Sequence, residues 1–108
     1  MGMIYYGGST APIQMEDRAL AQLKVVISTK LRRGEAFTLS WRHAAEEPDG
    51  RSTIWLHPSI PLRFVFEHPD PTELDRAWIE ELATSANSSS GIVLVTEHLT
   101  EDRVASLV

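Results

Sequence analysis

Residues 17–33 read DRALAQLKVVISTKLRR, and this stretch carries the clearest structural signal in the chain. Its apolar side chains recur three or four residues apart, at the spacing of one helix face: Leu20, Leu23, Ile27 and Leu31. Asp17 is expected to cap the helix start, and Arg32 and Arg33 lie where the helix dipole favours cations. Gly34 follows where a helix end favours a positive φ. The pattern predicts an amphipathic helix over residues 17–33.

The chain after this helix predicts three strands joined by short connections. Residues 36–42 alternate apolar and polar side chains, residues 52–57 follow the turn signal Pro48-Asp49-Gly50, and residues 62–67 alternate again. Because consecutive strands with short connections tend to be antiparallel neighbours, these three are expected to form one meander.

The chain before the helix predicts a hairpin. Residues 3–6 and 12–15 are short runs of strand-forming residues around Gly7-Gly8-Ser9-Thr10. A phosphate-binding role for the glycine pair is disfavoured, because a strand rather than a helix follows it.

A second helix is expected after the strands. Asp70, Pro71 and Glu73 form a helix-start pattern, and the helix is expected to run to about Ala86. Residues 92–95 predict a short strand buried on both faces, and residues 100–107 a last helical turn or two. The apolar side of the second helix, which ends at about Ala86, is expected to comprise Leu74, Trp78, Ile79, Leu82 and Ala86.

These elements follow the order ββ-α-βββ-α-β and predict a single α+β domain over residues 1–108. The expected architecture is a two-layer sandwich, with a mostly antiparallel sheet and both amphipathic helices on one face. A chain of 108 residues is long enough to bury a modest core of its own.

Composition excludes several chemistries. The chain has no cysteine, which rules out disulfides, thiolate zinc sites and thiol catalysis. It shows no signal peptide and no apolar run of membrane-spanning length, so a cytoplasmic protein without membrane contact is expected.

No catalytic constellation is evident. The four histidines, at positions 43, 57, 68 and 98, lack the spacing that places two imidazoles on one helix face. His43 and His57 lie at the ends of adjacent predicted strands, where they can approach each other or simply be polar strand-end residues. The chain contains neither a GxSxG elbow nor a phosphate-binding Walker A motif. We therefore expect no enzyme activity, no catalytic residue, no metal site and no cofactor.

Charge is unevenly distributed along the chain, whose formal net charge is −5. Residues 18–63 carry eight Lys and Arg against four Asp and Glu, whereas residues 64–108 carry two against nine. The densest basic cluster is Lys30, Arg32 and Arg33, and with Arg63 it is the candidate nucleic-acid surface, because phosphate neutralisation drives such binding. The alternative is that these cations compensate the helix dipole and pair with the acidic second half, within one molecule or between copies.

Trp55 is expected to lie on the open face of the sheet. In residues 52–57, Ile54 and Leu56 share one face, so Trp55 and Thr53 point to the other, as does Val65 across the meander. An apolar patch there predicts a partner surface, with a second copy of the chain as the expected partner. Otherwise the N-terminal hairpin or the C-terminal tail covers it.

Several stretches of the chain carry a family resemblance: residues 23–35, residues 37–41, residues 50–62, the N-terminal Ile4-Tyr5-Tyr6-Gly7, Arg76-Ala77-Trp78 and Ser85-Ala86-Asn87-Ser88. Together they resemble a family of small bacterial proteins of unknown function, often labelled "ATP-dependent DNA ligase". A ligase nucleophile needs a lysine in a K-x-D-G-x-R setting. Neither Lys24 nor Lys30 has it, so ligase catalysis is not expected.

The sequence thus predicts a non-catalytic interaction domain that self-associates through Trp55, Thr53 and Val65. The alternative is a nucleic-acid-binding accessory factor, related to DNA repair or ligation, that uses the basic end of the first helix.

Overall fold

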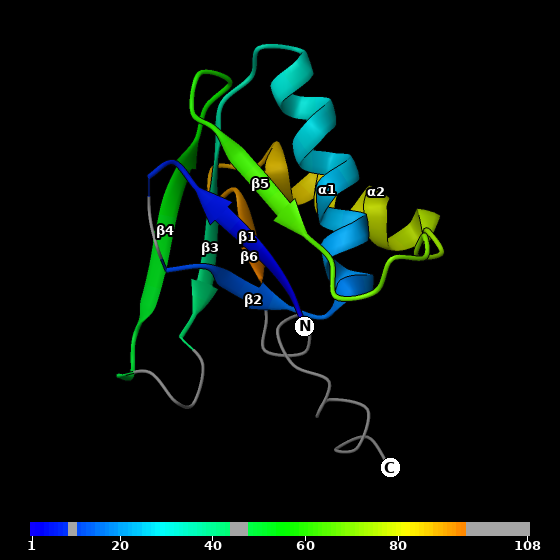
Figure 1. Ribbon diagram of the computed structural model, residues 1–108. Helices are drawn as coiled ribbons and strands as arrows, with labels where there is room; N and C mark the ends of the chain where they lie inside the picture. Colours follow the sequence, from blue (N-terminus) through cyan, green and yellow to red (C-terminus); the bar gives the residue numbers. More distant parts are fainter. Residues whose placement is uncertain (9–10, 44–47, 95–108) are drawn as a thin grey trace.

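A computed structural model describes residues 1–8, 11–43 and 48–94 (Figure 1). No helix within these residues is both long and apolar enough to cross a membrane. The expected last helical turn at residues 100–107 lies outside the described residues. In chain order the elements are β1 (Gly2–Tyr6), β2 (Ile13–Met15), α1 (Asp17–Arg32), β3 (Phe37–Arg42), β4 (Arg51–Leu56), β5 (Leu62–Val65), α2 (Arg76–Ala86) and β6 (Ile92–Leu94).

The strands form two sheets of three strands each. Sheet A has the order β2-β1-β5 and is antiparallel throughout. Sheet B has the order β4-β3-β6, in which β3 pairs antiparallel with β4 and parallel with β6. The α+β class and the element order are confirmed, and the strands are mostly antiparallel as expected.

The expected three-strand meander is wrong. β5 pairs with β1, in the register Met3↔Val65 to Tyr6↔Leu62, and not with β4. The connection explains this choice: Ile60 N–H donates to the His57 carbonyl and turns the chain, and Pro61 then accepts from Gly7 N–H. That bond places the start of β5 beside the end of β1, whose free edge supplies the partner.

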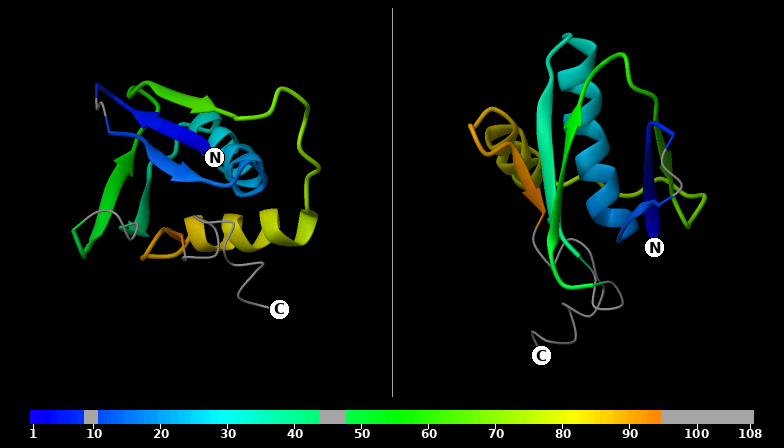
Figure 2. Two further views of the ribbon diagram at one scale, coloured as in Figure 1. Left: turned by 60° about the horizontal axis from the view of Figure 1, so that its bottom comes forward. Right: turned by 90° about the vertical axis from the view of Figure 1, so that its left-hand side faces the viewer.

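Both helices lie on one side of sheet B, as expected for the sandwich (Figure 2, left). Helix α1 lies between sheet A and α2, contacting β1 on one side and α2 on the other, while α2 also contacts β6. Helix α1 is therefore the centre of the molecule, and sheet A adds a further layer that the two-layer prediction did not include.

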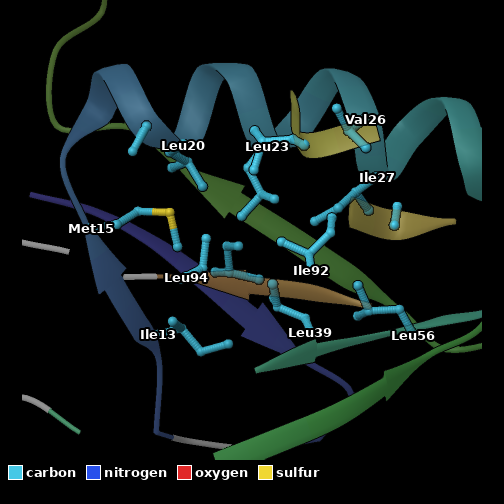
Figure 3. Close-up of a cluster of buried hydrophobic side chains, with 14 of the residues drawn as sticks. Ile13, Met15, Leu20, Leu23, Val26, Ile27, Leu39, Leu56, Ile92 and Leu94 are labelled. Carbon is cyan, nitrogen blue, oxygen red and sulfur yellow. The ribbon is translucent and has the colours of Figure 1, made fainter. Parts of the chain in front are cut away.

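The core forms where α1 meets both sheets (Figure 3). Leu20, Leu23 and Ile27 of α1 are almost fully buried, which confirms the apolar stripe, and Leu31 packs at its margin. They meet Leu39 of β3 and Ile92 of β6, both fully buried. Burying each such side chain contributes about 2 kcal/mol, so this interface dominates the stability of the fold.

The ends of α1 differ in part from the prediction. Glu16 is the N-cap residue and makes no side-chain cap bond, so the expected cap at Asp17 is wrong. The Asp17 carboxylate instead accepts from the backbone N–H groups of Glu67 and His68. Gly34 has a φ of +75°, as expected for the residue that ends this helix.

Helix α2 begins later than the sequence pattern predicts. Its N-cap is Asp75, whose carboxylate accepts from Trp78 N–H, so the predicted start at Asp70 and Pro71 is wrong. Leu74 therefore precedes the helix and is exposed instead of facing the core. Leu82 and Ala86 are buried as expected.

Candidate functional site

The open face of sheet B is the first candidate surface. Side chains alternate along each strand, so Ile54 and Leu56 of β4 point toward the helices while Arg51, Thr53 and Trp55 point away. The register places Thr38 opposite Trp55, Ser40 opposite Thr53 and Arg42 opposite Arg51 on this outer face, and Val93 of β6 lies beside Ser40. We call this set of seven residues the outer face of sheet B.

Two large apolar side chains are exposed on the outer face of sheet B. Trp55 is 55% exposed and Val93 is 52% exposed, which corrects the expectation that residues 92–95 are buried on both faces. A hollow of about 850 Å³ lies at the arginine end of the face, where Val93, Arg42 and Arg51 are among its lining residues and Trp55 is not. The face thus combines a projecting indole with a depression a few residues away.

The edge of β4 is partly covered beside this face. The Tyr6 hydroxyl at the end of β1 donates to the Trp55 carbonyl, so Trp55 turns its main-chain oxygen away from β3. This bond links the two sheets and occupies one of the acceptors that an edge strand otherwise offers to a foreign strand. The main-chain oxygen of β4 is therefore already paired at Trp55.

Of the residues predicted for a partner surface, Trp55 and Thr53 lie together and Val65 lies elsewhere. Val65 is half-buried in β5 of sheet A, opposite Met3, because β5 does not extend the β3–β4 pair. Val93 takes the place expected for Val65. Sequence analysis missed it because the run of four apolar residues at 92–95 gave no alternation to distinguish its two faces.

The predicted nucleic-acid residues differ in their surroundings. Lys30 is only 8% exposed, and its ammonium contacts Glu35 at 3.3 Å and donates to Asn87 Oδ1 at 2.6 Å. Arg33 lies 4.0 Å from the same Glu35 carboxylate. Arg32 is exposed at the end of α1, and Arg63 lies over the Tyr5 ring in sheet A, 5.8 Å from its centroid.

His43 and His57, for which the sequence left open a close approach or separate strand-end positions, lie apart. Because β3 and β4 are antiparallel, His43 follows the Arg42↔Arg51 end of the pair and His57 follows the Phe37↔Leu56 end. His43 contacts the Pro48 carbonyl and the Ser52 hydroxyl, and His57 contacts Ser59. Both act as local turn contacts. Within residues 1–8, 11–43 and 48–94, no group of three or more metal-ligating side chains is placed to hold an ion.

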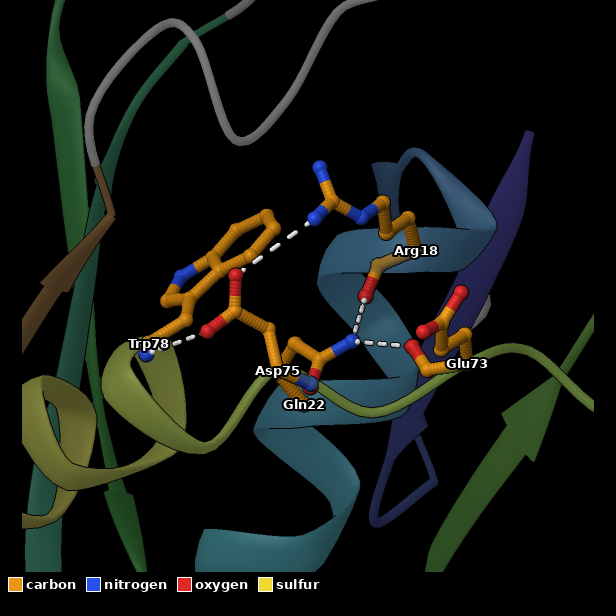
Figure 4. Close-up of polar contacts among 5 residues, drawn as sticks. All are labelled: Arg18, Gln22, Glu73, Asp75 and Trp78. Atoms are coloured by element: carbon orange, nitrogen blue, oxygen red, sulfur yellow. Dashed lines mark hydrogen bonds and ion pairs between the residues drawn. The ribbon is translucent and has the colours of Figure 1, made fainter.

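A polar clamp that sequence analysis missed fixes the start of α2 (Figure 4). The fully buried Gln22 amide donates to the carbonyls of Arg18 and Glu73, both at 3.0 Å, and accepts from Asp75 N–H at 2.8 Å. Arg18 lies 5.3 Å from the Trp78 ring centroid and 3.5 Å from the Asp75 carboxylate. The sequence did contain a signal for this contact. Gln22 lies on the same side of the helix as Ala19 and Val26, and that side is otherwise apolar.

Asp17 fixes the other end of the segment that leads to α2. Its carboxylate accepts from Glu67 N–H at 3.0 Å and from His68 N–H at 2.9 Å. Burial raises the pKa of Asp17, but these two donors, with the positive charges of His68 and the N-terminus, outweigh it and lower the pKa overall. The N-terminal ammonium likewise lowers the pKa of Glu67, to which it donates.

The stability of the protein should therefore decrease in acid through Asp17. A lowered folded-state pKa means that its contribution is complete above the ordinary value of 3.8 and is lost as the pH falls through the folded-state value. We expect Asp17→Asn to lower the free energy of unfolding by about 1 kcal/mol at pH 7. The deficit should shrink in urea denaturation below about pH 4. Asp49→Asn is the matched control, because that side chain is 92% exposed, and a deficit that does not change with pH would contradict the assignment.

Comparison with known proteins places the chain in a family. No curated protein and no solved structure is significantly similar to it. Residues 1–97 match the family model described as "Domain of unknown function (DUF7882)", a match that spans both sheets, both helices and the outer face of sheet B. The chain therefore belongs to the DUF7882 family.

Proposed function

We propose that this protein is a non-catalytic interaction domain that self-associates through the outer face of sheet B. The observation that carries the proposal is the exposed indole of Trp55, 55% accessible on a sheet whose other face is packed into the core. Tryptophan is the side chain that most often dominates the energy of a protein interface. Between Trp55 and the arginine end, the face consists of uncharged side chains, as interface centres do.

The shape of the face favours a second copy of the chain as the partner. Trp55 projects at one end, and the hollow of about 850 Å³ lies toward Arg42 and Arg51 at the other end. If two copies pack this face together about a two-fold axis, with their strands antiparallel, the projecting end of each meets the hollowed end of the other. Trp55 then contacts an arginine of the partner, a favourable cation–π pair. Two-fold dimers are also the commonest assembly of identical chains.

The test is the oligomeric state of the full chain. Light scattering after size exclusion should give a dimer mass at high micromolar concentration. Trp55→Ala should raise the dimer dissociation constant by about 30-fold or more, the cost of truncating an interface anchor. Leu74→Ala is the matched control, since Leu74 is 54% exposed but lies away from this face, and it should leave the constant unchanged.

Two outcomes would contradict the proposal. One is a monomer mass at every concentration for the unmodified chain, and the other is an equal effect of the two substitutions. The nucleic-acid alternative stays a prediction. It has weaker support, because Glu35 contacts both Lys30 and Arg33. A monomer whose DNA binding weakens steeply with added salt would favour it over self-association.

A further inference from the structure

A second surface lies on the opposite side of α1 from its core contacts. A groove of about 790 Å³ runs between α1 and the segment 66–74 that leads to α2. Its α1 wall carries Lys24, Ser28 and Arg32, spaced four residues apart and therefore aligned along the helix. A volume of this size is typical of small-molecule sites.

The groove is held open by the two anchors described above. Asp17 fixes the backbone of Glu67 and His68 at one end, and Gln22 fixes Glu73 and Asp75 at the other. Between them the segment contains Pro69 and Pro71, which have no N–H group to donate to the helix. The described residues 69–72 make no hydrogen bond to α1, so the segment stands off from the helix while both of its ends are fixed.

The groove combines cationic and apolar side chains. Among the described residues, neither Lys24 nor Arg32 makes an ion pair, and the Lys24 ammonium lies 5.8 Å from the centroid of the Phe66 ring. Phe66 and Leu74 supply apolar surface to the opposite wall, and Leu74 is 54% exposed. Asp70 is the single acidic residue of the lining, so the groove is positively charged.

We propose that this groove binds a small organic anion that has an apolar body and one carboxylate, sulfonate or phosphate group. The anionic group pairs with Arg32 and Lys24 and accepts from the Ser28 hydroxyl, as guanidinium and ammonium donors favour. The apolar body lies on Phe66 and Leu74. This site is separate from the outer face of sheet B, and the inference does not rest on self-association.

The test uses 4-phenylbutyrate as the probe and NMR chemical shifts of the full chain as the readout. We expect saturable shifts at the amides of Lys24, Ser28 and His68. Neutral 4-phenylbutyramide should bind at least fivefold more weakly, because it lacks the charge. Arg32→Gln should lower the affinity for 4-phenylbutyrate by about fivefold, which is the effect of removing one solvent-exposed ion pair. Lys24→Met should weaken it to a similar degree.

Arg63→Gln is the matched control, since Arg63 is an exposed arginine of sheet A outside the groove. It should leave the affinity unchanged. Absence of shifts at millimolar probe would overturn the proposal, as would equal binding of acid and amide or shifts centred on Trp55. Binding to anionic lipid vesicles but not to the free acid would overturn the assignment to a soluble ligand. Because Lys24 and Arg32 are exposed, these variants should fold normally, and their amide spectra check this directly.

Discussion

Replacing Gly91 with alanine is expected to destabilise the protein by about 4 kcal/mol or more, a loss that few single substitutions cause. Gly91 joins α2 to β6, is buried, and has a φ of +68°. A Cβ at this position would overlap both the side-chain oxygen and the main-chain carbonyl of Thr38 in β3. The side chain can rotate away but the carbonyl cannot, so the β6 connection must move off β3.

The control for this prediction isolates the contact from the backbone conformation. Gly34 has a φ of +75°, close to that of Gly91, but a Cβ there would meet no atom within 4 Å. Gly34→Ala should therefore cost only the strain of a left-handed backbone, about 1 kcal/mol. Urea denaturation of both variants gives the comparison. Similar losses at the two positions would show that Gly91 is needed for its φ alone.

Replacing Gln22 with leucine is expected to lower the free energy of unfolding by about 3 kcal/mol, because the Glu73 carbonyl and the Asp75 N–H lose their partner. For a domain of this size the loss corresponds to a decrease of about 15 °C in Tm. Leucine has a volume close to that of glutamine and adds apolar surface. A large loss therefore identifies the hydrogen bonds, not packing, as the source of the stability.

Gln14→Leu provides the matched control for Gln22→Leu. Gln14 is exposed on β2, so the same chemical change there should alter the free energy of unfolding by less than about 0.5 kcal/mol. Thermal unfolding followed by circular dichroism measures both variants. Equal, small effects would mean that water replaces the Gln22 amide and that the clamp contributes little.

Helix α1 could be predicted from the sequence because its signal is local. The spacing of Leu20, Leu23 and Ile27 is set by the helix itself, and all three are buried. The hairpin of β1 and β2 and the pair of β3 and β4 were also predictable, since each pair is formed by neighbouring segments with a turn signal. These three elements account for the correct fold class.

The partners of the central strands could not be predicted in the same way. β1 pairs with residues 62–65 and β3 with residues 92–94, and the local sequence pattern indicates neither pairing. The predicted start of α2 was wrong for a related reason. Asp70 and Pro71 form a good helix start locally, but a side chain 53 residues before Asp75 along the chain binds the backbone there and holds it extended.

The same nonlocal contacts decided how much of the candidate surface could be predicted. Trp55 was placed correctly, because alternation within one strand suffices to assign its face. Val65 was misplaced because its assignment required knowing the sheet. Lys30 looked like part of an exposed basic cluster, but Asn87, which follows α2, and Glu35 surround its ammonium group.

The two sheets share one pattern of near and distant strand partners, although the distant strand is antiparallel in sheet A and parallel in sheet B, and this pattern matters while the chain is being synthesised. Each has a central strand with one partner from the adjacent segment and one from far downstream: β1 has β2 and then β5, and β3 has β4 and then β6. A nascent chain that ends before residue 62 holds both hairpins but neither distant strand. Both central strands then keep an unpaired edge, the form of exposure that promotes aggregation. The chain closes its second sheet only when residues 92–94 are available, so no shorter N-terminal portion is a finished fold.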